Sequence, residues 1–232
     1  MPRKKRRKDA GLVRHVMSRG DGRERIFLDD RDYQKFYFLL QEMVEEYDVE
    51  CRDICLIPNH FHLTLFHERE NLSDAMQFLK GEFAIWWNGA HDHVGHVFEG
   101  PFKDQIVQEQ DYALSLARYI ALNPVRAGLV QRPEDWPWSA YRYFAGLADP
   151  PEFLSCAPVL RLLGEGDDQE LRERYIRFVL TPTPRELMRE EAFRSRQRVI
   201  GCKEFKQRMK SAPRGISPTR SQPSTVFTPG FV

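Results

Sequence analysis

The order of strand-like and helix-like segments in the first half of the chain limits the fold more than any other feature. The strand-like segments are residues 12–18, 49–57, 61–66, and 97–98 continued by 102–108. The helix-like segments are residues 32–47, 72–88 and 111–121. Their order, strand, helix, strand, strand, helix, strand, helix, is a split βαβ pattern on one antiparallel sheet. We therefore predict an α+β fold of the ferredoxin-like type.

Apolar periodicity and turn residues support these assignments. In residues 32–47 the apolar side chains recur at three- and four-residue steps, which is typical of an amphipathic helix. Pro58 and Asn59 separate two strand-like runs and predict a hairpin. Pro124 is expected to end or kink the third helix, because proline has no backbone N–H. The expected helix N-caps are Asp29, Asp30, Asp32, Asn71 and Asp111.

The chain is long enough for one main domain with an appendage. The expected parts are a basic arm at 1–9, the ferredoxin-like domain at 10–145, a small helical and charged appendage at 150–210, and a disordered tail at 211–232. A linker at 149–151 is expected to precede the appendage, which should contain helices at 168–180 and 184–209. The tail is rich in Ser, Thr, Pro and Gly, a composition that disfavours a packed core.

Both ends of the chain are basic, although the formal net charge is only +1. Such ends either add sequence-independent affinity for phosphates or merely keep the chain solvated. No apolar run is long enough for a membrane-spanning helix, and no signal peptide follows the basic start, so we expect a cytoplasmic protein. The four cysteines lack C-x-x-C spacing, and we expect them to be reduced thiols without a functional role.

A His-x-His pair is the first candidate for chemistry. His60 and His62 flank Phe61 in a strand-like run, so both imidazoles should point to the same face of the sheet. Two imidazoles can bind a divalent metal and leave coordination positions open for the oxygens of a phosphate. Such a pair on a strand is more often a packing feature or part of an exposed polar face, and the motif alone leaves that alternative open.

A tyrosine on the third helix is the second candidate. Tyr119 and Asn123 are four residues apart, so they should share one helix face. A phenol becomes a nucleophile toward phosphorus when a nearby cation favours the phenolate. Tyr37 and Gln41 have the same spacing on the first helix, and most helical tyrosines are simply amphipathic surface residues. Spacing alone therefore does not choose between the two tyrosines.

Three sequence strings surround these candidates. They are CLIPNHFHL at 55–63, GHVFEG at 95–100 and YIALNPVRAGL at 119–129. Together and in this order, they resemble the REP-associated tyrosine transposases, which belong to the HUH single-strand nucleases. The resemblance covers roughly residues 12–145 and favours Tyr119 as the functional tyrosine.

The resemblance implies a metal-dependent DNA nicking and joining enzyme. In that family one tyrosine, here Tyr119, forms a covalent 5′-phosphotyrosine intermediate. The implied metal is Mg²⁺ or Mn²⁺, and its ligands match His60, His62 and Asn123. Asn123 precedes Pro124, which disfavours helical backbone at this position, so a water or Glu99 is an alternative third ligand.

The implied partner is single-stranded or hairpin DNA from a REP element, bound by a monomer or a dimer. Arg19, Lys103 and Arg126 match positions expected to contact this DNA. Pro101 stands where the family usually has an arginine, so one cation expected near the DNA is missing. Two other functions stay open: a non-catalytic protein that binds single-stranded nucleic acid, and a metal-dependent hydrolase that uses activated water.

Overall fold

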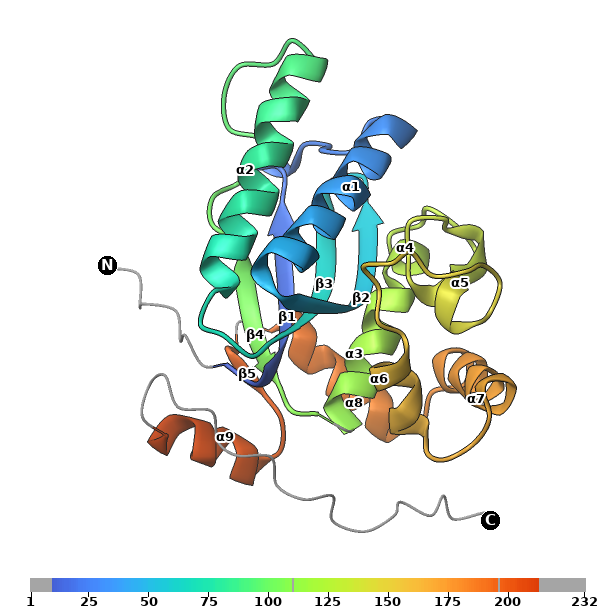
Figure 1. Cartoon of the computed structure of the whole chain (residues 1–232). Coiled ribbons are helices and arrows are strands. Elements are labelled where there is room, and N and C mark those ends of the chain that lie inside the picture. The colour runs from blue at the N-terminus through green and yellow to red at the C-terminus, as the bar shows by residue number, and fades with distance from the viewer. Residues whose placement is uncertain (1–9, 110, 196, 213–232) are drawn as a thin grey trace.

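A computed structural model describes residues 10–109, 111–195 and 197–212 of the chain. Within these ranges five strands form one sheet in the order β2-β3-β1-β4-β5 (Figure 1). The strands are β1 (Leu12–Arg19), β2 (Val49–Ile57), β3 (His60–His67), β4 (Lys103–Val107) and β5 (Val199–Ile200). The pairs β2–β3, β3–β1 and β1–β4 are antiparallel, and β5 joins β4 in parallel. The predicted α+β, ferredoxin-like arrangement is confirmed.

The helices cover both faces of this sheet. They are α1 (Asp30–Tyr47), α2 (Leu72–Ala90), α3 (Asp111–Ala121), α4 (Asn123–Arg126), α5 (Tyr141–Phe144), α6 (Ala157–Leu160), α7 (Asp168–Leu180), α8 (Pro184–Arg194) and α9 (Lys203–Ser211). Short 3₁₀ turns lie at Asp21–Arg23, Pro133–Asp135 and Arg161–Leu163. Figure 1 shows α1 and α2 side by side across one face, whereas α3 and α8 pack together behind it. No helix within the described ranges has the length and apolar character needed to cross a lipid bilayer.

Strand alternation divides the core into two unequal parts. Val16 of β1 and Phe61 of β3 face the larger core, where Phe36 and Phe83 of α1 and α2 are buried. The neighbouring residues point to the opposite face. That face carries a smaller apolar cluster, which joins the sheet to α3 and α8. Its members are Val13, Cys55, Ile57, Val107, Leu116, Ile120, Phe193 and Ile200.

Several helix termini follow the expected chemistry. Asp29 caps α1, and its side chain and that of Asp32 form a reciprocal capping box. Asn71 occupies the N-cap position of α2 without a side-chain cap: its Nδ2 donates to the carbonyl of Tyr47, and its Oδ1 has no partner among the described residues. Asp111 is the first residue of α3 and not the residue before it. The third helix ends at Ala121, and a separate short helix with a proline in its first turn follows, as Pro124 predicted.

Two predicted segments were wrong in extent. Only Lys103–Val107 of the expected fourth strand is regular, and Phe98 forms a single bridge with Gly20. The expected helix at 184–209 is two helices with β5 between them. The cause is tertiary: the edge of β4 presents unpaired backbone groups, and the β-branched pair Val199 and Ile200 satisfies them. The predicted basic arm at 1–9 and the tail beyond residue 212 lie outside the described residues.

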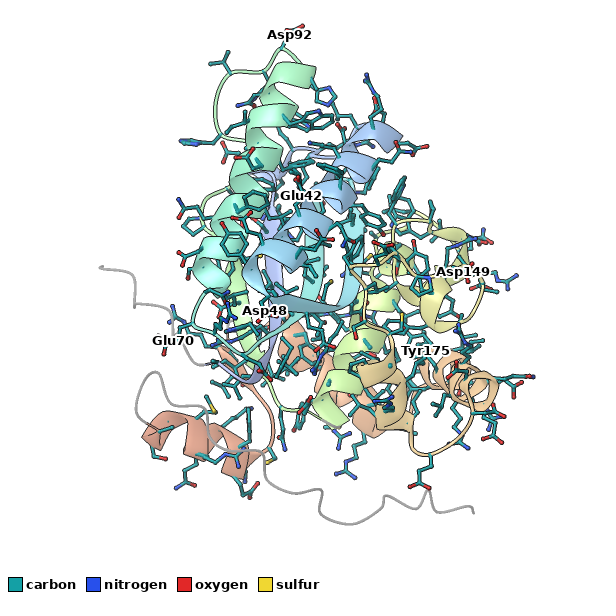
Figure 2. The ribbon with its side chains drawn as sticks, in the orientation of Figure 1. Glu42, Asp48, Glu70, Asp92, Asp149 and Tyr175 are labelled. Carbon is teal, nitrogen blue, oxygen red and sulfur yellow. The ribbon has the colours of Figure 1, made fainter. Side chains whose placement is uncertain are left out.

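Residues beyond 145 pack directly against the rest of the chain. Tyr175 of α7 is fully buried and its ring lies 4.9 Å from that of Phe144 (Figure 2). On the outer edge of β2, the backbone N–H of Ser155 donates to Cys51 over 2.8 Å. With β5 on the opposite side, both edges of the sheet are therefore covered by segments from the C-terminal part.

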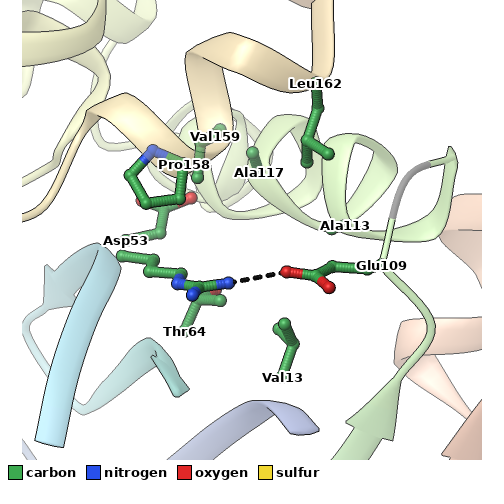
Figure 3. A pocket seen from close by; sticks show the side chains of 10 residues that line it. Val13, Asp53, Thr64, Glu109, Ala113, Ala117, Pro158, Val159 and Leu162 are labelled. Carbon is green, nitrogen blue, oxygen red and sulfur yellow. Dashed lines mark hydrogen bonds and ion pairs between the residues drawn. The ribbon is translucent and has the colours of Figure 1, made fainter. Parts of the chain in front are cut away.

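A small cavity with apolar and polar lining lies between the sheet, α3 and α6 (Figure 3). Asp53 and Thr64 line it, and the Oδ2 of Asp53 and the Oγ1 of Thr64 have no partner among the described residues. An ion pair between Arg52 and Glu109, with an N–O distance of 2.9 Å, borders the cavity. Burial raises the pKa of the Asp53 carboxyl well above its ordinary value of 3.8. Asp53 is therefore protonated in the folded protein over a pH range in which it ionises in the unfolded chain.

Replacing Asp53 with asparagine tests this burial. The raised pKa means that the stability contributed by the protonated carboxyl is complete below pH 3.8 and is lost as pH rises. Asp53→Asn has no such loss, so its free energy of unfolding should exceed that of the wild type by more than about 1 kcal/mol at pH 7 and by little near pH 4. Urea unfolding at both pH values measures the difference. Asp149→Asn, at an exposed aspartate, is the control, and a pH-independent difference for Asp53→Asn would contradict the prediction.

Candidate active site

The two histidines of the His-x-His pair begin strand β3, directly after a fixed turn. The carbonyl of Pro58 accepts hydrogen bonds from the backbone N–H groups of Ile26 and Phe27 at 2.7 and 3.0 Å, which anchors the turn to the segment before α1. The rings of His60 and His62 lie on the α3 side of the sheet with their centroids 4.9 Å apart. The period of the strand thus places both imidazoles in one site.

Both imidazoles are held neutral by their surroundings. Burial, together with the nearby charge of Arg19, lowers the pKa of His60 to about 4, against a hydrogen bond with Asn123 that acts in the opposite direction. Burial also lowers the pKa of His62 well below 6.5, with His15, His60 and Arg19 adding to the effect. At neutral pH each ring therefore has one nitrogen lone pair available to bind a cation.

Asn123 lies beside these rings. It is the first residue of α4, and its Nδ2 is 3.1 Å from the Nε2 of His62. A half-turn of the amide would present the Oδ1 at the same place, because the two ends of an amide have nearly the same shape. Two neutral imidazoles and one amide oxygen suit a divalent cation that keeps open positions. The described residues hold no cluster of three or more His, Cys, Asp or Glu side chains suited to a metal.

Tyr119 projects from α3 into the same site. Its ring centroid is 5.6 Å from that of His62, and the rings are nearly perpendicular. Burial raises the pKa of its phenol, whereas the guanidinium groups of Arg194 and Arg126 act in the opposite direction. Tyr37, which has the same spacing to a polar residue, lies on α1, where it is half-buried with its ring 5.1 Å from that of Phe153. The fold therefore brings Tyr119 to the histidines and keeps Tyr37 away from them.

The predicted DNA-contacting cations lie at different distances from this centre. Arg19 pairs in register with His60 across β1 and β3, so it lies at the edge of the site. Arg126 stacks over the Tyr119 ring, with its guanidinium carbon 5.6 Å from the ring centroid. Lys103 lies on β4 and forms an ion pair with Glu99 at 2.5 Å. That pairing occupies the Glu99 side chain that was considered as an alternative metal ligand.

Four residues of the site were not predicted. His15 contacts His62, Gln105 contacts His15, and Phe193 and Arg194 of α8 line the Tyr119 side. The available signal was that Arg14 and His15 stand between Val13 and Val16 in a strand-like run, because polar groups buried in strands need partners. Phe193 and Arg194 gave no signal, since nothing local relates α8 to the tyrosine helix.

Comparisons with known proteins agree on one kind of protein. The model of the family described as "Transposase IS200 like" matches residues 10–123. A Haemophilus influenzae protein provisionally named as a REP-associated tyrosine transposase is 25% identical over 158 residues, which span 60% of this chain and 90% of that protein. A solved structure of a REP-associated tyrosine transposase bound to a REP hairpin is similar with a TM-score of 0.55. It is 18% identical and covers 67% of this chain and 92% of that one, so it supports the fold.

The protonation state of His60 is directly measurable. In the metal-free protein its ring signals should titrate with a midpoint near pH 4, because the effect of burial on the pKa outweighs that of the hydrogen bond with Asn123. Nuclear magnetic resonance of histidine-labelled protein from pH 3.5 to 8 gives this midpoint, and His60→Gln assigns the signal. A midpoint at the ordinary value of about 6.5 would show that the site is open to water.

Proposed function

We propose that the protein is a DNA transposase of the IS200-like kind that cuts and rejoins single strands folded as hairpins, and the family model that matches residues 10–123 supports this proposal. The observation that supports the chemistry most strongly is the convergence of Tyr119 from α3, His60 and His62 from β3, and Asn123 from α4 on one face of the sheet. The similar structure with a bound REP hairpin makes hairpin DNA the proposed partner.

Tyr119 is the proposed nucleophile. Its Oη attacks the scissile phosphorus, a new O–P bond forms, and the bond from phosphorus to the 3′ oxygen breaks. The phenol proton leaves to solvent, and the departing 3′ oxygen takes up a proton to become a free hydroxyl. The product is a 5′-phosphotyrosine, which a second 3′-hydroxyl reverses to join the strands. Arg126 over the ring and the nearby charge of Arg194 favour the phenolate that this attack requires.

His60, His62 and Asn123 are the proposed ligands of Mg²⁺ or Mn²⁺. The neutral imidazoles and the amide oxygen provide three donors and leave positions for phosphate oxygens. A divalent cation bound there would polarise the scissile phosphate and stabilise the charge that develops on it. Asn59 supports this role, because its Oδ1 accepts from the Nδ1 of His60 over 2.8 Å and leaves the Nε2 bare.

Cations around the centre are the proposed phosphate contacts. Arg19 and Arg126 adjoin the site, and Lys103 lies farther along the same face on β4. Arg194, exposed on α8, adds a cation from the C-terminal part. These groups give affinity for the DNA backbone and position it, whereas base recognition requires contacts of other kinds.

Removing one oxygen atom tests the nucleophile. Tyr119→Phe keeps the ring contacts with His62 and Phe193, so folding and hairpin affinity should stay near wild type. Covalent adduct and cleavage should fall together by at least about 1000-fold. The assay incubates protein, hairpin DNA and Mn²⁺ and resolves covalent complexes on a denaturing gel. Tyr37→Phe is the control and should retain full activity.

Two outcomes of this experiment would change the assignment. An adduct formed by Tyr119→Phe would place the nucleophile elsewhere. Cleavage without adduct would favour a metal-dependent hydrolase that uses activated water. A wild-type protein that binds hairpins but neither cuts them nor forms an adduct would favour a non-catalytic binding protein.

Metal removal tests the histidine pair. Wild-type activity should disappear with chelator and return with Mg²⁺ or Mn²⁺, because weak ligands bind the ion reversibly. His60→Ala and His62→Ala should each weaken Mn²⁺ binding by about 100-fold or more, and calorimetry measures this without DNA. Full cleavage by the double variant would show that the histidines only pack the site.

A further inference from the structure

A relay of hydrogen bonds leads from the C-terminal part to His62. The Nε2 of Gln105 donates to the backbone carbonyls of Ser195 and Gln197 over 3.2 and 2.9 Å. The Oε1 of Gln105 is 3.0 Å from the Nδ1 of His15. The Nε2 of His15 is 2.9 Å from the Nδ1 of His62. Gln105, His15 and His62 are all buried, so no bulk water competes for these bonds.

Every proton in this relay has one allowed position. The two backbone carbonyls only accept, so the amide nitrogen of Gln105 must face them and its Oε1 must face His15. The Oε1 only accepts, so the Nδ1 of His15 carries a hydrogen. A buried imidazole without a carboxylate partner is neutral, so the Nε2 of His15 is a bare acceptor. The Nδ1 of His62 must then donate to it, and the Nε2 of His62 is left without a hydrogen.

The tautomer of His60 is fixed in the same way, by a residue that is adjacent to it in the chain. The Nδ2 of Asn59 donates to the carbonyl of Arg23 over 3.3 Å, so its Oδ1 faces the Nδ1 of His60 at 2.8 Å. In each case a backbone carbonyl orients a side-chain amide, and the amide fixes an imidazole. Asn59 is adjacent to His60 in the chain, whereas Gln105 and His15 come from two other strands.

We propose that His15 and Gln105 are positioning residues that hold His62 in the tautomer with a bare Nε2 facing Asn123, and that the backbone at Ser195 and Gln197 sets this arrangement. The inference rests on the proposed function in that a bare Nε2 is what a metal ligand needs. It gives the C-terminal part a task at the active site, namely to orient His62 through Gln105, which precedes its backbone partners Ser195 and Gln197 by 90 and 92 residues in the chain.

His15 is not a general base in this arrangement. Both of its ring nitrogens are engaged, one by Gln105 and the other by His62. Its ring centroid lies 6.0 Å from that of Tyr119, in an edge contact. His15 therefore has no free nitrogen to accept the phenol proton, and its effect on the reaction passes through His62.

Gln105→Met tests the relay, because methionine keeps the length of the side chain but cannot orient His15. Gln108→Met is the matched control: Gln108 accepts from the backbone N–H of Cys202 over 2.8 Å, so it binds the same C-terminal part without touching His15. The first measurement is the tautomer of each histidine in metal-free protein, from ¹⁵N resonance of labelled rings. The second is Mn²⁺ affinity by calorimetry.

We expect the wild type and Gln108→Met to show His62 protonated at Nδ1 and bare at Nε2. Gln105→Met should show a mixture of His62 tautomers and bind Mn²⁺ about 10- to 100-fold more weakly. The His60 signal should not change, because Asn59 holds it independently. His15→Phe, which preserves the ring contacts with Tyr119 and Phe193, should reproduce the effect if Gln105→Met does not fold.

Each other outcome of these measurements would support or overturn either the hydrogen-bond relay or the metal assignment. A wild-type His62 protonated at Nε2 would overturn the relay, and so would unchanged tautomer and affinity in folded Gln105→Met. A wild-type protein with the expected tautomer that binds no Mn²⁺ would support the relay and overturn the metal assignment. The tautomer measurement uses neither DNA nor metal, so its failure is distinct from failure of the proposed function.

Discussion

The antiparallel pairing of β1 between β3 and β4 is the constraint on which the site depends. In this register His15 lies opposite Gln105 of β4 and opposite Thr64 of β3. His62 precedes Thr64 by two residues, so its side chain points to the same face of the sheet. Because side chains alternate along a strand, a slip of one residue would turn His15 into the core under α1 and α2 and bring Val16 to the site. Burial of Val16 and Phe61 in the large apolar core therefore sets the strand register, and this register places the polar side chains of the site on the opposite face.

A second interaction ties the tyrosine helix to the C-terminal part. Arg118 of α3 is fully buried, where it pairs with Glu186 at 3.1 Å and with Glu190. Glu190 also pairs with Arg126, so one carboxylate joins α8 to both α3 and α4. Removal of one partner from such a buried network typically costs about 3–5 kcal/mol, because a charge is left uncompensated. The network holds Tyr119 and Asn123 in place relative to the histidines.

The C-terminal part therefore contributes to the candidate active site as well as to the fold. Through α8 it supplies Phe193 and Arg194 beside Tyr119, and through Ser195 and Gln197 it orients Gln105. Its strand β5 also covers the β4 edge, which otherwise leaves backbone groups unpaired. Burial and cations act in opposite directions on the pKa of the Tyr119 phenol, so the packing that positions this proposed nucleophile also affects its acidity.

The sequence by itself determined the order of the first elements, the ferredoxin-like class and the shared face of His60 and His62, because strand and helix periods are local properties. It also supplied Tyr119 and Asn123 as a pair at one-turn spacing. Tertiary structure alone decided that this helix meets the histidines, that residues 184–209 break around β5, and that His15 contacts Gln105 across 90 residues. These depend on which distant surfaces pack together, and no local period encodes that choice.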